Sequence, residues 1–250
     1  MMEITMLKKV DLSGATFVEG FPGIGLVGPM SISYMIDKLD MECVGYIDSQ
    51  NFPPLISIHK GEPMHPIRLY YSKQNQIITI FAEFAIPLDL VYEITETVYG
   101  FVTKNKIKVI YSIGGLPIGM QPGQQAKGGT VFGVASKKSL STKMQKAELK
   151  PIVEGVSTGV SAMLLVKSKA DELDNINLMV AVQPGIVDPR YAESAIICLN
   201  KLMELDIDIS DLEREAKEVE AKISEIISKH KESHENYKNA VGDSGPSMYA

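Results

Sequence analysis

The sequence predicts an α/β fold in which helices cover both faces of a mostly parallel sheet. Short apolar runs that end in turn residues alternate with longer segments of helical periodicity, from residue 15 to about residue 203. The run from Leu178 to Val182 is continuously apolar, which is typical of a central strand covered on both faces. Asp188 and Pro189 are the N-cap and first-turn residues that begin a helix. This alternation favours a three-layer α/β/α sandwich.

The N-terminal half supplies most of the predicted strands. The first is expected at 15–19 and ends in a glycine-rich turn at 20–28. Turn residues at 72–75 predict a hairpin between two later strands. The remaining strands are expected at 43–47, 55–58, 67–71 and 76–81, and helices at 24–39 and 88–104.

The C-terminal half continues the same pattern. A buried strand at 108–113 is expected to stop at Gly114-Gly115, and the turn from Ser112 to Gly119 is either a ligand pocket or a tight structural turn. The other elements are expected at 131–135 and 177–183 for strands, and at 137–149, 155–170 and 188–205 for helices.

The composition divides the chain into three parts. Residues 1–205 are predicted to form the α/β domain, 206–235 a charged amphipathic helix, and 236–250 a flexible Gly/Ser/Pro-containing tail. A heptad spacing in the helix indicates either packing on its own domain or pairing with another subunit. Its apolar positions are Leu212, Ala216, Val219, Ile223 and Ile226.

Charge and hydropathy exclude several classes of protein. The net charge of −6 and the pI of about 5.3 argue against nucleic-acid binding, which usually needs a basic face. No segment approaches the roughly 18 apolar residues of a membrane span, and the first ten residues do not resemble a signal peptide. Cys43 and Cys198 lie far apart in apolar runs, which favours free thiols in a reducing cytoplasm.

One short pattern suggests nucleotide binding. Gly23, Gly25 and Gly28 match G-x-G-x-x-G between a predicted strand and a predicted helix, and Asp48 follows the next strand. In a dinucleotide fold, the backbone N–H groups of such a turn face a pyrophosphate and the acid reaches a ribose hydroxyl. A structural turn or a protein-contact loop is the other interpretation, since glycines also permit close packing.

Catalytic and metal-binding patterns are sparse. The sequence holds no G-x-S-x-G, H-E-x-x-H or paired Cys-x-x-Cys motif, so no catalytic residue, metal or cofactor is expected. His230 and His234 are four residues apart but have no evident third ligand. Glu83, flanked by apolar residues at a strand end, is either a functional acid or a core carboxylate with a partner.

The last three residues contrast with the polar segment before them. Met248 offers a flexible apolar side chain, Tyr249 a ring with a hydroxyl, and Ala250 an α-carboxylate. Such a terminal peptide suits capture in a pocket of a partner protein.

Together these features resemble the proteasome-assembly-chaperone family, in its archaeal-type homo-oligomeric branch. The resemblance covers about residues 16–203. The residues that carry it are Phe21-Pro-Gly-Ile-Gly-Leu-Val-Gly28, Val44-Gly45, Ser49-Gln-Asn-Phe-Pro-Pro54, Gly61 and Gly114-Gly-Leu-Pro117.

The resemblance implies a nucleoside-phosphorylase-like fold without catalysis. It implies a cytoplasmic protein that binds α subunits of the proteasome 20S core particle, as assembly chaperone, activator or both. Met248, Tyr249 and Ala250 match the family's C-terminal hydrophobic-Tyr-any motif, which enters pockets between α subunits. The resemblance also implies a homo-oligomer, such as a tetramer or pentamer. The alternative, based on Gly23 to Gly28, is a nucleotide-binding enzyme, either an ATP-grasp-like ligase or a nucleoside-processing enzyme.

Overall fold

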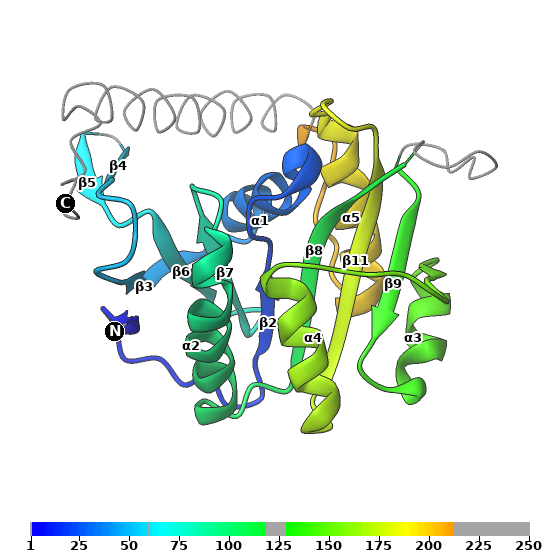
Figure 1. Ribbon diagram of the computed structural model, residues 1–250, viewed down its shortest axis with the longest axis horizontal. Helices are drawn as coiled ribbons and strands as arrows, with labels where there is room; N and C mark the ends of the chain where they lie inside the picture. The colour runs from blue at the N-terminus through cyan, green and yellow to red at the C-terminus, as the bar shows by residue number, and fades with distance from the viewer. Residues whose placement is uncertain (1, 60, 119–128, 213–250) are drawn as a thin grey trace, which may run out of the picture.

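A computed structural model describes residues 2–59, 61–118 and 129–212. These residues form a nine-stranded mixed sheet with helices on both faces, and a separate two-stranded arm projects from one side (Figure 1). The predicted α/β/α sandwich is confirmed. The four central strands run parallel, whereas most of the outer strands run antiparallel to their neighbours.

The order across the large sheet is β1-β3-β6-β7-β2-β8-β11-β9-β10, and β4 pairs with β5 in the arm. In chain order the strands are β1 (Glu3–Met6), β2 (Thr16–Glu19), β3 (Glu42–Asp48), β4 (Ser57–His59), β5 (Glu62–Met64), β6 (Ile67–Ser72), β7 (Ile77–Ala82), β8 (Val109–Pro117), β9 (Val131–Ala135), β10 (Lys150–Pro151) and β11 (Asp174–Val182).

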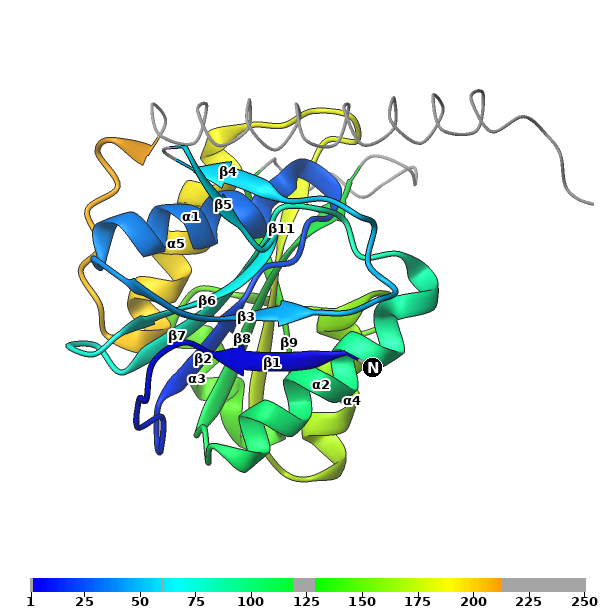
Figure 2. The same ribbon diagram turned by 90° about the vertical axis from the view of Figure 1, so that its left-hand side faces the viewer.

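The helices divide between the two faces of the sheet. Helices α1, α3 and α5 pack on one face, and α2 and α4 pack on the other (Figure 2, seen from the β1 edge). Their bounds are α1 (Val27–Lys38), α2 (Val91–Lys104), α3 (Ser141–Lys146), α4 (Val160–Ala170) and α5 (Pro189–Met203), with short 3₁₀ turns at Ile24–Leu26, Leu88–Leu90 and Lys138–Leu140.

Sequence periodicity explains how these helices are oriented. In α2 the side chains of Val91, Ile94, Val98 and Val102 recur every three or four residues and are all buried against the sheet. Helix α5 begins as predicted, with the Asp188 carboxylate accepting a hydrogen bond from a first-turn backbone N–H. The sheet is therefore covered on both faces by apolar sides of helices.

The glycine-rich turn after β2 is shaped by close backbone contact. A Cβ on Gly28 would lie 2.7 Å from the carbonyl carbon of Gly20, so neither position tolerates a side chain without a shift. Gly25 has a φ of 71°, and a Cβ there would lie 3.0 Å from Val182 on β11. These glycines let the turn pack against itself and against a central strand.

Some elements differ from the sequence prediction. Strand β8 does not stop at Gly114-Gly115 but continues to Pro117, because β11 pairs with it along its whole length. Helix α4 begins at Val160, later than predicted, after Gly159 with a φ of 87°. Strands β1, β5 and β10 were not predicted, since each has no more than four residues and depends on its partner strand.

The chain after α5 returns along the body. Asn200 exchanges two hydrogen bonds with the backbone of Ile207, and the Tyr34 hydroxyl donates to the Asp208 carbonyl at 2.6 Å. Ile207 and Leu212 are buried in the same core as α1 and α5. Residues 206–212 thus pack on the α/β domain, which agrees with the first of the two alternatives stated for the segment that begins at residue 206.

Candidate functional site

Two buried glutamates, Glu19 and Glu83, lie at the ends of the neighbouring parallel strands β2 and β7. Glu83 comes directly after β7 and is 3% exposed. Arg68, on the adjacent strand β6, is 2% exposed and donates from Nη1 to the Glu83 Oε2 at 2.9 Å. Burial alone lowers the pKa of Arg68, but the Glu83 carboxylate and the Tyr70 phenol outweigh this effect and raise it. The two side chains therefore form a charged pair inside the protein.

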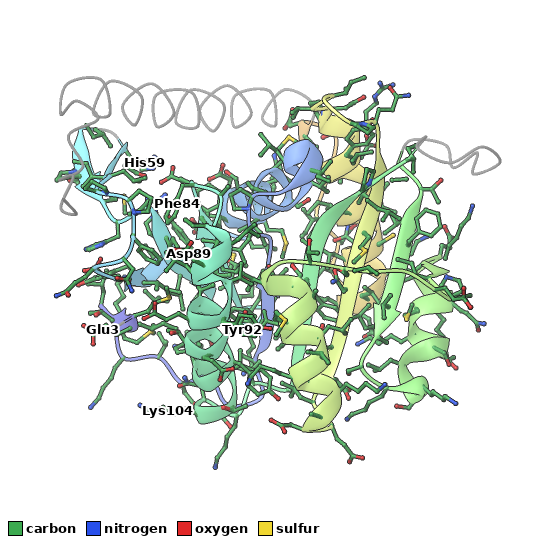
Figure 3. The ribbon with its side chains drawn as sticks, in the orientation of Figure 1. Glu3, His59, Phe84, Asp89, Tyr92 and Lys104 are labelled. Carbon is green, nitrogen blue, oxygen red and sulfur yellow. The ribbon has the colours of Figure 1, made fainter. Side chains whose placement is uncertain are left out.

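His59 completes this cluster from the arm. Its Nε2 lies 2.9 Å from Glu83 Oε1 and 3.1 Å from Arg68 Nη2. Arg68 also donates from Nε to the Tyr70 hydroxyl and from Nη1 to the His65 carbonyl, both at 2.8 Å. Figure 3 shows His59 on the arm, in the same corner as Phe84. Of the two interpretations of Glu83, the structure supports the core carboxylate with a partner.

Glu19 has a different environment at the end of β2. It is 0% exposed, and its Oε1 has no hydrogen-bond partner among the described residues. Burial raises the pKa of the Glu19 carboxyl, while the nearby hydroxyls of Ser112 and Ser161 and the Phe21 N–H reduce this rise. The Phe21 N–H donates to Oε2 at 3.3 Å; the Ser112 hydroxyl is near but makes no hydrogen bond of ordinary geometry.

A polar row continues from Glu19 across the sheet. Ser112 on β8 is the register partner of Glu19, and Asn177 on β11 is the register partner of Ser112. Both are at most 1% exposed, and neither side chain has a hydrogen-bond partner within the described part of the chain. Glu19 was not predicted as a site residue, although it is an acid at the end of an apolar strand, and the row becomes visible only from the strand register.

The residues of the nucleotide-binding interpretation are not brought together. Gly23, Gly25 and Gly28 follow β2, but Asp48 ends β3, three strand positions away in the sheet. At about 4.8 Å per strand, this separation is about 14 Å. In a dinucleotide fold the acid-bearing strand lies beside the glycine-bearing one. The Asp48 carboxylate instead accepts a hydrogen bond from the Ser49 N–H.

The C-terminal candidates lie outside the described residues. These are Met248, Tyr249 and Ala250, together with His230, His234 and the heptad positions after Leu212. Leu212 itself is 1% exposed in the core of the α/β domain. Its burial agrees with packing on the same chain at the first heptad position.

The described residues hold neither a cluster of metal ligands nor a helix that could span a membrane. Within these ranges, no three His, Cys, Asp or Glu side chains gather closely enough to hold a metal ion. Nor does any described helix have the length and hydropathy that crossing a membrane requires.

Comparisons with known proteins identify relatives along almost the whole chain. A Methanocaldococcus jannaschii protein is 30% identical over 236 residues, which cover 92% of each chain. The crystal structure of Pyrococcus furiosus PbaA, described as an archaeal homologue of proteasome-assembly chaperone, has 27% identity and a TM-score of 0.81. That match covers 94% of this chain and all of PbaA. P. furiosus PbaB, described as an archaeal proteasome activator, has 23% identity and a TM-score of 0.74, over 90% of this chain and 98% of PbaB. At that identity, the PbaB match shows the fold alone.

A model of the PAC2 family matches residues 17–227. This match includes the glycine-rich turn and the Phe-Pro-Pro segment that carried the resemblance to proteasome-assembly chaperones. The resemblance is therefore confirmed, and the chain belongs to the PAC2 family.

Proposed function

We propose that this protein binds the proteasome 20S core particle and acts on it without catalysis, as an assembly chaperone, an activator or both. In this proposal Met248, Tyr249 and Ala250 enter pockets between α subunits. PAC2 family membership is the observation that carries it, since PbaA is described as an archaeal homologue of proteasome-assembly chaperone. Activation is part of the proposal because the resemblance to proteasome-assembly chaperones implies either role.

The terminal tripeptide has chemistry that suits a pocket with a basic group at its base. The α-carboxylate is ionised at neutral pH and would pair with a receptor lysine. The Tyr249 ring would bury apolar area while its hydroxyl makes a directed hydrogen bond. Met248 would fit an irregular apolar surface because its thioether side chain adapts easily.

One tripeptide is too small to bind tightly, so the proposal includes a homo-oligomer. Several copies of the terminal peptide on one assembly would bind together, and avidity of this kind adds about 10²–10⁴ to the affinity. Tetramers and pentamers are the states that we propose, with residues after Leu212 contributing to their contacts. Native mass spectrometry of the purified full chain measures the number of subunits directly.

The decisive experiment compares three chains in a core-particle binding assay. These are the full chain, a chain that lacks residues 248–250, and a Tyr249→Phe variant. We expect the truncation to lower core-particle binding by at least about tenfold, and Tyr249→Phe to lower it less because the ring remains. Equal binding by the full and truncated chains would exclude the tripeptide from the mechanism.

Peptidase assays then distinguish the two roles. An activator raises hydrolysis of a fluorogenic peptide by the mature core particle, and the truncated chain should not. A chaperone instead binds free α subunits and increases the yield of assembled rings. Lack of binding to α subunits and to core particles alike would overturn the proposal.

The nucleotide-binding alternative has less support. Gly25 and Gly28 already serve close packing, and Asp48 lies about three strand spacings, roughly 14 Å, from the glycine turn. Addition of ATP or NAD should leave the thermal unfolding midpoint unchanged, because a ligand that binds only the folded state would raise it.

A further inference from the structure

A cavity of about 320 Å³ lies at the edge of the large sheet opposite β1, between β9, β10 and α3. Its apolar lining includes Val134, Met144, Leu149 and Ile152, and Gln145 lies on its rim side as an exposed residue of α3. Figure 1 shows these elements at the far edge of the sheet from the arm. The cavity is large enough for an apolar side chain of another molecule.

The sheet edge beside this cavity is open. Strand β10 pairs with β9 only at Lys150 and Pro151, after which the Ile152 N–H donates to the Gly133 carbonyl at 3.1 Å. The ladder ends there, although β9 continues to Ala135. An open strand edge offers backbone groups to an extended peptide, which can add to the sheet by strand pairing.

The same elements carry an unusual concentration of positive charge. Residues 137–150 contain five lysines and one glutamate, in a chain whose net charge is −6. Two of the lysines have partners, since Lys137 pairs with Asp174 and Lys143 donates to the Tyr111 hydroxyl. The other three, which are exposed and have no ion-pair partner among the described residues, are Lys138, Lys146 and Lys150.

Exposed apolar side chains follow the cavity in the sequence. Val153 is 89% exposed and Val156 is 96% exposed, in the segment that leads from β10 to α4. Neither valine lines the cavity, but both follow its last lining residue, Ile152, in the sequence. Concave shape, open strand edge and positive charge thus coincide at β9, β10 and α3.

We propose that this β9–α3 surface, formed by residues 133–152, binds an extended acidic segment of another protein. One apolar side chain of that segment fills the cavity, and its carboxylates pair with Lys138, Lys146 and Lys150. Acidic residues next to an apolar one fit best, because Lys138 lines the cavity itself and Lys146 and Lys150 are sequence neighbours of the lining residues Gln145 and Pro151. A concave cavity beside a strand edge favours a peptide over a membrane surface. The inference goes beyond the proposed function and does not involve residues 248–250.

The test uses the full chain and a short fluorescent peptide of alternating glutamate and leucine. We expect fluorescence anisotropy to detect binding that weakens at high salt, because exposed ion pairs are screened. Lysine in place of glutamate in the peptide should abolish binding. In NMR spectra of the full chain, the acidic peptide should shift the amide signals of Gly133, Ala135 and Ile152.

Two triple variants test whether peptide binding depends on the positive charge of this surface. Changing Lys138, Lys146 and Lys150 to glutamate should weaken peptide binding by at least about tenfold. The matched control changes Lys73, Lys104 and Lys108 to glutamate, which alters net charge equally at exposed sites on other elements. Figure 3 shows Lys104 at the end of α2, away from α3. Equal loss of binding in both triple variants would overturn the proposal.

The cavity is tested at its exposed rim. Gln145→Trp should fill it and weaken peptide binding, whereas Gln145→Ala should not. If Gln145→Trp binds the peptide normally, the cavity takes no part.

A changed oligomeric mass of the lysine triple variant would assign the surface to contacts between copies instead. Charge-dependent binding to anionic lipid vesicles that Gln145→Trp leaves intact would assign it to a membrane. A chain that lacks residues 248–250 should bind the peptide normally, so this test is independent of the proteasome proposal.

Discussion

Glu19 and Glu83 lie at the ends of adjacent parallel strands and are at most 3% exposed, but their surroundings differ. Glu83 has Arg68 at 2.9 Å and His59 at 2.9 Å, whereas Glu19 has one long hydrogen bond from a backbone N–H and no cationic partner. The pKa of Glu19 is raised by burial. Burial of a carboxyl group in this protein therefore has two outcomes, one a charged cluster and the other a group that favours its proton.

The Glu83 cluster and the Glu19 row also make different contributions to the structure. The Glu83 cluster joins the arm to the body, because His59 comes from β4 and Arg68 from β6. The Glu19 row lies beneath the first turn of α4, where Ser161 contributes a hydroxyl. The stability of the Glu83 cluster depends on ion pairing, whereas that of the Glu19 row depends on keeping its polar groups uncharged in the core.

The largest expected effect comes from removing the cation of the Glu83 cluster. Arg68→Met leaves the buried Glu83 carboxylate without its arginine partner, which should lower the free energy of unfolding by about 3–5 kcal/mol. Urea unfolding at neutral pH measures this loss. The double variant Arg68→Met/Glu83→Gln should recover part of it, because no buried charge remains. A double variant as unstable as Arg68→Met would mean that packing, rather than charge, determines the effect.

An intermediate effect of opposite sign is expected at Glu19. Glu19→Gln removes the ionisable group from a site that disfavours its charge, so we expect a gain of about 1–2 kcal/mol near neutral pH. Asp48→Asn, at an exposed carboxylate of the same sheet, is the control and should change stability little.

The pH dependence provides a sharper test of Glu19. Because the folded pKa is raised above 4.5, the folded state holds this proton more tightly than the unfolded state. The wild-type chain therefore has this contribution at low pH and loses it as the pH rises from 4.5 through the raised pKa. The advantage of Glu19→Gln should be near zero below pH 4.5 and should grow as the pH rises above it. A difference that does not vary with pH would contradict the assignment.

The smallest effect is expected at His59, whose side chain is 36% exposed. His59→Ala removes a hydrogen bond to Glu83 but leaves Arg68 in place, so the loss of stability should be about 1 kcal/mol. Hydrogen exchange of residues 57–64 should become faster while exchange in β7 remains slow. Ile58→Ala, at an exposed position on the same strand, is the control. Equal effects of the two variants would mean that His59 does not hold the arm.

The sequence predicted the layers of the fold because buried central strands and amphipathic helices leave clear periodic patterns. It did not predict β1, β5 and β10, whose short runs carry no pattern of their own. The predicted stop of β8 at Gly114-Gly115 was also wrong, for a different reason. Gly115 is needed where the Ile24 carbonyl approaches the strand, so glycine here marks close packing rather than the end of an element.

For the candidate sites, the sequence indicated single residues but not their partners on other strands. Glu83 stood out in the sequence because apolar residues flank it, but Arg68, its partner, lies on another strand and is found only from the β6–β7 register. Glu19 had the same signal, an acid at the end of an apolar strand, directly before glycine. The terminal tripeptide was identified from its chemistry and from its match to the family's C-terminal motif, and its docking into a partner's pocket stays a prediction.

The packing of residues 206–212 has a geometric consequence for any assembly. Asp211 pairs with Lys38 at the end of α1, and Leu212 is anchored in the core. The position of Leu212 relative to the α/β body is therefore fixed in every copy of the chain. In a symmetric oligomer, the Leu212 positions would be related by the same symmetry as the bodies that hold them. A change at Lys38 or Asp211 would then act on all of these positions at once.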